Sequence, residues 1–239
     1  IKGVIDSAII SHMLRKNKTF RVNVQRELKK VLYAYNEFRY KKGYCKKLLR
    51  DIFNSIDKII LEHIHVLTKD DGKPFRGILA SAFRGISVSD AMPMSAIQTE
   101  VLKKEDSCVD EDGTHEISVH RECILPNQKF SFTVTLDTAM TKEIGITSID
   151  QVLDILQEDF DATHKLLASK FKKVSPSIFK ALEPANAYIG SNTGFVQKTI
   201  IMAAFTDDEK TGIDIIKAIL DVNFQKAKHN SKDKFMAPR

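Results

Sequence analysis

"VHRECILPNQKFSFTVTLD" (residues 119–137) carries the strongest β-strand pattern in the chain. Phe130, Phe132, Val134 and Leu136 alternate with serine and threonine, and this period of two predicts a strand with one buried face. The residues Pro-Asn-Gln at 126–128 separate this run from an earlier extended run. We therefore expect the two runs to pair as a hairpin.

Around this stretch, the chain switches between helical and extended patterns. Apolar residues at positions 1, 5, 9 and 13 have helical spacing. The same reasoning predicts helices at Ile1–Arg15, Val24–Tyr40, Lys47–His63, Ser148–Phe171, Phe195–Phe205 and Thr211–Phe224. Short strands are expected at Phe83–Ser89 and Ala96–Leu102. Because strands and helices do not alternate strictly, the order predicts an α+β fold.

The composition is that of an ordinary soluble globular protein, with 239 residues of which 43% are hydrophobic and 28% are charged. No apolar run reaches the roughly 18 residues that span a bilayer. Cys45, Cys108 and Cys123 show no zinc-ligand spacing, so we expect free thiols, no metal site and a reducing cytoplasmic location. The chain begins with Ile1 rather than methionine, so we also expect an upstream segment.

The positive charge is concentrated in the first quarter of the chain. The formal net charge is +6, yet residues 1–58 contain fifteen lysines and arginines against five acidic residues, a net charge of +10. Residues 100–116 are acidic by contrast. This asymmetry predicts a polyanionic partner. The alternative is a solvated, lysine-rich helix face.

The stretch "AYIGSNTGFVQKTII" (residues 187–201) has the look of a phosphate-binding loop. A nucleotide-hydrolysing P-loop needs its lysine directly after the second glycine, whereas three residues separate Gly194 from Lys198. Nucleotide hydrolysis is therefore disfavoured. Two glycines still allow close approach of an anion, and a helix that begins near Phe195 would add free amides and a positive dipole end. We expect a phosphate contact here; the alternative is a turn without a ligand.

Four segments of the sequence resemble, in order, the motifs of one family. "IKGVIDSAI" resembles a helix-opening "SxKGxxR" motif, and "FRGISVSDA" a "VSDS" strand. "VHRECILPNQKFSFTVTLD" is similar to a "RExhxPGtxFxFxhxhd" hairpin, and "YIGSNTGFVQKTII" to a "GxGxGFxxKT" loop. These are motifs of the RAMP proteins of CRISPR effector complexes. The forms "VSD" and "GFxxKT" are most similar to the fifth RAMP subunit of the type III-A (Csm) complex.

The resemblance implies two ferredoxin-like (RRM-type) modules. The first would cover residues 1–136 with a basic helical insertion, and the second residues 137–239 with the glycine-rich loop. The resemblance also implies a non-catalytic subunit without cofactors, which binds the guide (cr)RNA toward its 3′ end and the repeated backbone RAMP subunit. Such a subunit supports guide maturation and complex assembly for antiviral defence. Target RNA and recruited host nucleases are further candidate partners, and no membrane is implied.

The family motifs, together with the basic loop at residues 68–77 that contains Arg76, point to a set of RNA-binding residues in this chain. They are Lys2, Gly3, Arg76, Arg84, Arg121, Gly190, Ser191, Asn192, Thr193, Gly194 and Lys198. Three departures stand out: Asp6 replaces the arginine of the opening motif, and Asn127 and Asn192 each replace a glycine. Asn127 can adopt the left-handed conformation of a turn, so we expect that turn to be preserved.

Two rival functions stay open at this point. A metal-independent RNA-processing endoribonuclease of the related guide-excising RAMP group would need a histidine or tyrosine to deprotonate the 2′-OH and a lysine to stabilise the leaving group. His12 and His120 are the candidate bases. His12 falls near an apolar stripe, which favours a packing role, and Asp90 is expected to be structural. Phe75 lies in a basic loop, where it would stack on a base or pack locally. A protein scaffold without RNA affinity is the other rival.

Overall fold

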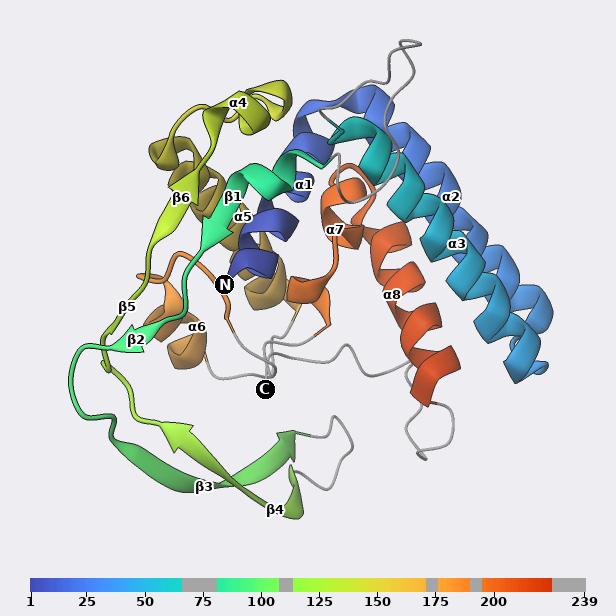
Figure 1. Ribbon diagram of the computed structural model, residues 1–239. Helices are drawn as coiled ribbons and strands as arrows, with labels where there is room; N and C mark the ends of the chain where they lie inside the picture. Colours follow the sequence, from blue (N-terminus) through green and yellow to red (C-terminus); the bar gives the residue numbers. More distant parts are fainter. Residues whose placement is uncertain (66–80, 108–113, 171–175, 190–194, 225–239) are drawn as a thin grey trace. The chain divides into compact units, whose positions relative to one another are not determined.

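The computed structural model describes residues 1–65, 81–107, 114–170, 176–189 and 195–224 (Figure 1). The chain divides into two compact units. The helical unit comprises Ile1–Ile86 and Leu136–Arg239, and the strand unit comprises Ser87–Thr135. Helices and small two-stranded sheets occur together, which confirms the predicted α+β class.

The described residues of the helical unit form five long helices. These are α1 (Lys2–Lys16), α2 (Lys18–Phe38), α3 (Lys42–His63), α5 (Ile149–Lys170) and α8 (Glu209–Phe224). The shorter elements are η2 (Ala82–Gly85), α4 (Thr138–Thr141), η3 (Lys142–Ile144), α6 (Pro176–Leu182), η4 (Val196–Lys198) and α7 (Ile201–Ala204), where η marks a 3-10 helix. All five long helices were predicted from apolar periodicity.

Helix α2 begins six residues before its predicted start because Asn17 caps it. The Asn17 side chain accepts a hydrogen bond from the Phe20 amide at 3.0 Å, which satisfies one amide at the open end of the helix. Phe20 is fully buried. The cap and this buried ring together fix the helix start.

Helices α2 and α3 form an antiparallel pair that packs with α8 around the main hydrophobic core (Figure 1). Val24, Leu28 and Val31 line the buried face of α2, at the spacing of a helical stripe. Polar contacts tie the pair to its neighbours: the Tyr35 hydroxyl donates to Asp221 of α8 at 2.7 Å, and the Gln25 amide donates to the Ala204 carbonyl of α7 at 2.7 Å. Because the apolar face of each helix packs on the core, the polar faces of α2 and α3 lie toward solvent.

Among the described residues, six strands pair in nested order as a two-stranded ribbon, nearly all of which belongs to the strand unit. They are β1 (Ile86–Val88), β2 (Met92–Pro93), β3 (Thr99–Ser107), β4 (Thr114–Ile124), β5 (Phe130–Ser131) and β6 (Val134–Leu136). Strand β1 pairs with β6, β2 with β5, and β3 with β4. The β3–β4 register runs antiparallel from Thr99↔Ile124 to Ser107↔Thr114, with an irregularity between Lys103 and Glu105.

The predicted hairpin through residues 126–128 is wrong. Strand β4 pairs with β3, which precedes it, and β5 pairs with β2. The predicted strand at 130–136 is also interrupted between β5 and β6, where the Thr133 amide donates to the Ser89 hydroxyl at 2.9 Å. Asn127 does have φ of 66°, so the expected left-handed conformation is confirmed. The turn therefore bends one edge of the ribbon instead of closing a hairpin.

Gly85 sits at a close approach between η2 and α4. A β-carbon at this position would lie 2.9 Å from both the Asp137 carbonyl oxygen and Met140 Cβ. The Asp137 amide also donates to the Gly85 carbonyl at 2.7 Å. The predicted strand at Phe83–Ser89 consequently starts only at Ile86, after a 3-10 turn that the Ser81 side chain caps. Gly85 is required by space rather than by its own dihedral angles.

The two ferredoxin-like modules remain a prediction. The boundary expected between residues 136 and 137 lies one residue from a junction of the two units, which falls between Thr135 and Leu136. Residues 1–86 belong to the same compact unit as residues 136–239. A division into modules 1–136 and 137–239 would instead place them in different units. The described thiols are as expected, because Cys45 and Cys123 are free; Cys108 lies outside the described residues.

Candidate nucleic-acid interface

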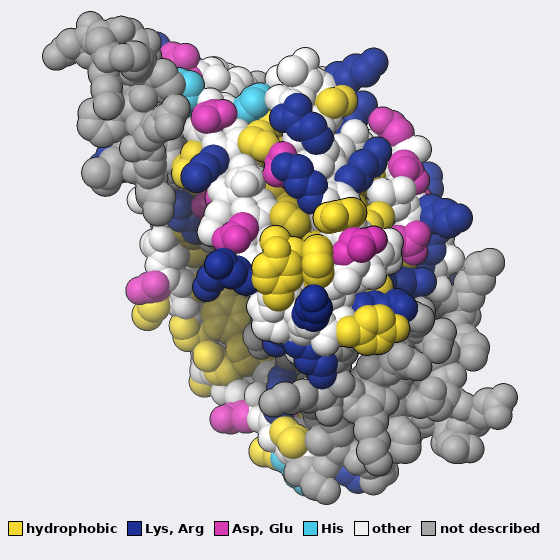
Figure 2. Space-filling model, turned by 90° about the vertical axis from the view of Figure 1, so that its right-hand side faces the viewer, with side chains coloured by type: hydrophobic (Ala, Val, Ile, Leu, Met, Phe, Trp, Pro, Cys, Tyr) yellow, Lys and Arg dark blue, Asp and Glu magenta, His cyan; other side chains and the backbone are white. Residues whose placement is uncertain are grey.

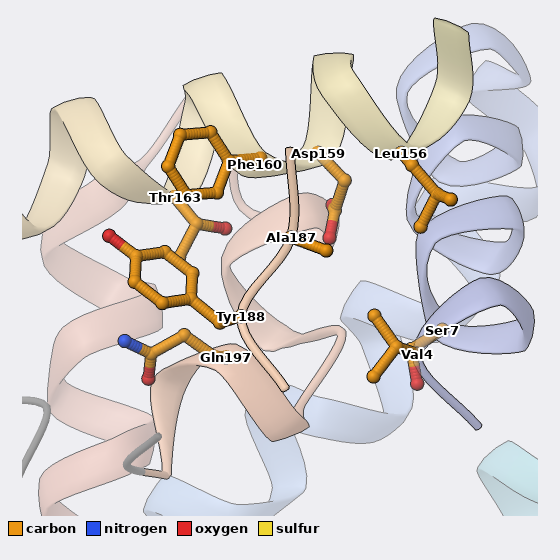
Figure 3. A pocket seen from close by; sticks show the side chains of 9 residues that line it. All are labelled: Val4, Ser7, Leu156, Asp159, Phe160, Thr163, Ala187, Tyr188 and Gln197. Atoms are coloured by element: carbon orange, nitrogen blue, oxygen red, sulfur yellow. The ribbon is translucent and has the colours of Figure 1, made fainter. Parts of the chain in front are cut away.

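Two of the four family-like segments meet at one pocket in the helical unit (Figure 3). Val4 and Ser7 come from the opening segment in α1, whereas Ala187, Tyr188 and Gln197 flank residues 190–194 on both sides. Helix α5 supplies the remaining wall, formed by Leu156, Asp159, Phe160 and Thr163. The pocket is small, with a cavity volume of about 20 Å³, and is partly open to solvent. Segments about 190 residues apart in sequence thus share one surface.

Gln197 lines this pocket, and its side-chain amide lies next to the Tyr188 ring (Figure 3). Both Nε2 and Oε1 are buried without a hydrogen-bond partner among the described residues. A buried amide without partners costs free energy, so a polar ligand here would be stabilised by it. Gln197 is therefore a candidate donor and acceptor that the sequence alone did not single out.

Aromatic side chains form part of the same lining. The rings of Phe160 and Tyr188 lie 4.9 Å apart between centroids, and His164 stacks on Phe160 at 5.3 Å. The Tyr188 hydroxyl is 2.9 Å from His164 Nδ1. Burial raises the pKa of Tyr188 above its usual value, so the phenol stays protonated at neutral pH. This part of the lining is a rigid apolar surface with one polar edge.

Lys2 has a structural contact in addition to its predicted role. Its ammonium donates to the Phe83 carbonyl at 2.9 Å and to the Ile86 carbonyl at 2.7 Å, and so joins the start of α1 to the start of β1. An ammonium carries three N–H donors, so one remains for an anion. Gly3 is exposed, and no atom lies within 4 Å of the position of an added β-carbon. The protein interior therefore gives no steric reason for glycine at position 3.

Asp6, which replaces the motif arginine, is poorly solvated. Its Oδ1 atom is buried without a hydrogen-bond partner among the described residues. Burial raises the pKa of Asp6 from 3.8 to about 6, although the nearby positive charge of Lys2 opposes this rise. An acidic group stands where the family places a phosphate-binding cation, so Asp6 itself cannot supply that contact.

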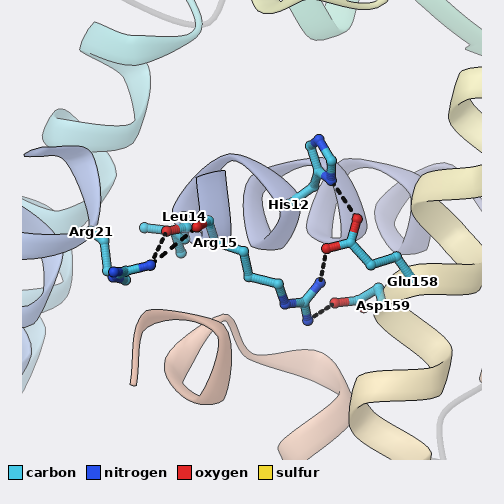
Figure 4. A network of polar contacts seen from close by, with 6 residues as sticks. All are labelled: His12, Leu14, Arg15, Arg21, Glu158 and Asp159. Carbon is cyan, nitrogen blue, oxygen red and sulfur yellow. Dashed lines mark hydrogen bonds and ion pairs between the residues drawn. The ribbon is translucent and has the colours of Figure 1, made fainter. Parts of the chain in front are cut away.

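A polar network beside the pocket fixes α1 against α5 (Figure 4). His12 Nδ1 lies 2.7 Å from Glu158, and the Arg15 guanidinium donates to Asp159 at 2.7 Å. Arg21 donates to the Arg15 carbonyl at 3.1 Å and so joins α2 to the end of α1. His12 is therefore a contact residue between helices, as the packing interpretation expected.

The helix predicted at Phe195–Phe205 is wrong, and one argument for anion binding is wrong with it. Only the three-residue turn η4 follows residues 190–194; Thr199 is then extended, with φ −129° and ψ 150°, before α7 begins. The β-branched residues Thr199, Ile200 and Ile201 disfavour a continuous helix. Since a single 3-10 turn has little macrodipole, a helix N-terminus does not support the expected phosphate contact here.

The other predicted residues are spread over the molecule. Lys198 ends η4 with an exposed side chain, and Arg84 is exposed in η2 of the helical unit. Arg121 and His120 are exposed in β4 of the strand unit, and Asp90 is exposed after β1. Phe75, Arg76, Gly190, Ser191, Asn192, Thr193 and Gly194 lie outside the described residues. The structure thus brings the opening segment near the flanks of the glycine-rich loop.

The described part of the chain shows no metal centre and no membrane segment. No group of three histidine, cysteine or acidic side chains among the described residues is placed to hold a metal ion. Likewise, none of the described helices is both long enough and apolar enough to cross a bilayer. The polar groups that line the pocket are hydroxyls, one carboxylate and one side-chain amide.

Two curated proteins match the chain, both described as "CRISPR system Cms protein Csm5" and both from Mycobacterium tuberculosis strains. The chain resembles Csm5. Each match is 25% identical over 153 residues, which are 63% of this chain and 37% of the relative. The expected likeness to a Csm subunit is confirmed. The matched region thus spans little more than a third of the curated relatives, and no family model and no solved structure gives a significant match.

Proposed function

We propose that this chain is an RNA-binding subunit of a type III-A CRISPR (Csm) ribonucleoprotein. It binds the guide RNA toward its 3′ end, contacts the adjacent backbone RAMP subunit and has no catalytic role of its own. The likeness to Csm5 supports the complex. The observation that carries RNA binding is the shared pocket, because the opening segment and both flanks of the glycine-rich loop line it.

Gln197 of the pocket lining, and residues close to the lining in sequence, have the groups that a phosphodiester backbone requires. Gly3 leaves room for close approach of a phosphate, and Lys2 keeps one N–H donor in addition to its two carbonyl contacts. Lys198 places an exposed cation at the far side of the loop, and Gln197 offers a buried amide to a ribose or base edge. We propose that these four residues contact consecutive nucleotides, with phosphates dominating the affinity.

The salt dependence of binding tests this proposal. A fluorescent single-stranded RNA would be titrated with the protein at several salt concentrations, and log K plotted against log salt. Each phosphate contact contributes a slope of about −0.7 for single strands. Lys198→Gln should weaken binding to all sequences similarly and make the slope shallower by about 0.7.

Lys142→Gln is the matched control. Lys142 and Lys198 are both exposed lysines, and each lies in a three-residue 3-10 turn. Each substitution therefore removes one positive charge from the same type of local structure. Equal losses in the two variants would indicate a general charge effect and reject the pocket as the binding site. A salt-independent affinity of the wild-type protein would reject phosphate-dominated binding altogether.

The endoribonuclease alternative keeps one structural argument. In many enzymes a carboxylate orients the histidine that acts as general base. Glu158 lies 2.7 Å from His12 Nδ1 and could orient it in the same way. Under the proposed function, purified protein leaves a repeat RNA intact, and His12→Ala changes stability only. Cleavage by the wild-type protein that His12→Ala abolishes would replace the proposal with the enzyme.

A further inference from the structure

The end of the α2–α3 pair has an unusual concentration of exposed aromatic side chains. Four of the five tyrosines in the chain lie between residues 33 and 44, and the chain contains no tryptophan. Tyr33, Tyr40 and Tyr44 keep 64%, 82% and 50% of their surface exposed. We call these three residues the tyrosine face. Rings with this exposure add little to the core, so their position calls for another explanation.

Neighbouring rings and a guanidinium hold the tyrosine face in place. Phe38 packs edge-on against Tyr33 at 6.3 Å and against Tyr44 at 4.9 Å between ring centroids. The Arg39 guanidinium lies 4.9 Å from the centroid of the Tyr40 ring and donates to its hydroxyl at 2.9 Å. Because these contacts restrict ring rotation, a ligand would lose little side-chain entropy on binding here.

The surface around these rings is strongly basic. Residues 26–50 contain nine lysines and arginines and two acidic residues, a net charge of +7. One of the acids, Glu27, is mostly buried and already paired with Lys30 at 2.7 Å. Four exposed lysines, Lys41, Lys42, Lys46 and Lys47, form what we call the lysine quartet. Figure 2 shows the side of the molecule that carries α2 and α3, where yellow apolar and dark blue basic side chains are interleaved.

We propose that the tyrosine face and the lysine quartet form a second RNA contact, which binds unpaired nucleotides. The lysines attract the phosphates, and the exposed rings stack on bases. Base–aromatic stacking requires that the base faces be accessible, so single-stranded RNA fits this surface better than duplex RNA. The net positive charge of this surface favours an anionic occupant. The inference rests on the proposed RNA-binding function and adds a binding site distinct from the pocket.

An abasic probe separates stacking from phosphate attraction. A fluorescent 15-nucleotide uridine RNA and an abasic 15-mer with the same ribose-phosphate backbone would be titrated with the full chain. The double variant Tyr33→Leu with Tyr44→Leu should bind the uridine RNA roughly tenfold more weakly and the abasic oligomer unchanged. Changing the lysine quartet to glutamine should weaken both probes. The conservative variant Tyr33→Phe with Tyr44→Phe should retain wild-type binding of both.

A second readout uses the position of the tyrosines. Since four of the five tyrosines belong to this region, the intrinsic tyrosine fluorescence reports mainly on it. The uridine RNA should change this emission and the abasic oligomer should not. Circular dichroism and a thermal melt of each variant would check that the fold is retained.

Each other outcome overturns the inference in a recognisable way. If the leucine variant binds both probes as wild type does, the rings do not stack. If it loses both probes equally, the rings support the fold only. If the quartet variant retains RNA but no longer binds an acidic Csm subunit, the surface docks a protein. If the wild-type protein binds neither probe, the proposed function fails as well.

Discussion

Replacement of Asp6 by asparagine should stabilise the protein above neutral pH. The Asp6 carboxyl has a buried Oδ1 without a hydrogen-bond partner among the described residues, and burial raises its pKa from 3.8 to about 6. An acid with a raised pKa binds its proton more tightly in the folded state. Stability therefore falls as the pH rises from about 4 through about 6, and Asp6→Asn should remove this fall.

The size of the effect follows from the shift. A rise of roughly two pKa units corresponds to about 3 kcal/mol against the ionised folded form. Because the carboxyl retains partial contact with solvent, screening reduces the expected gain to about 1–2 kcal/mol. For a chain of this size, the gain corresponds to an increase in Tm of about 3–6 °C at pH 8.

Thermal melts of both proteins between pH 4 and pH 8 measure this directly. The difference in Tm should be largest and constant above about pH 7, and should shrink steadily toward pH 4. All other titrating groups are shared, so their effects cancel in the difference. A difference that does not change with pH, or a variant less stable at pH 8, would refute the argument from burial.

Three further substitutions test the contacts of α1 beside the pocket and the close approach of η2 to α4. Gly85→Ala should lower the unfolding free energy by about 2 kcal/mol in urea titrations, because its β-carbon would lie 2.9 Å from a backbone oxygen. Gly43→Ala is the control: it has open space around it and should not lower the unfolding free energy. Arg15→Met should cost about 2 kcal/mol by the same assay, since it leaves the Asp159 carboxylate without its partner. Gly3→Ala should stabilise α1 by about 0.5–1 kcal/mol and weaken RNA binding. Unchanged RNA affinity in Gly3→Ala would mean that no phosphate approaches there.

The helices could be predicted from sequence, whereas the strand pairing could not. Helical periodicity is local, so α1, α3, α5 and α8 follow from the order of apolar residues alone. Strand pairing depends on distant partners, and the Pro126-Asn127 turn carried a hairpin signal that the β3–β4 register overrides. The start of α2 was missed because the cap Asn17 precedes any apolar residue of that helix.

The candidate site was predicted in part. The motifs indicated the opening segment and the glycine-rich segment, and the structure places Val4 of the first and Gln197 of the second on the lining of one pocket. The α5 wall, with Asp159 and Phe160, has no motif of its own and is recruited only by tertiary packing. The tyrosine face had a sequence signal, since its rings cluster within twelve positions beside lysines, but aromatic residues on helices usually indicate a core.

Native co-purification from the source cell tests the central claim most directly. The protein would be isolated under mild conditions, and the bound RNA and proteins identified by sequencing and mass spectrometry. The proposed function predicts a stoichiometric complex that contains other Csm subunits and one class of small RNA with a defined 5′ tag. Recovery of the protein alone, without RNA and without Csm subunits, would contradict it.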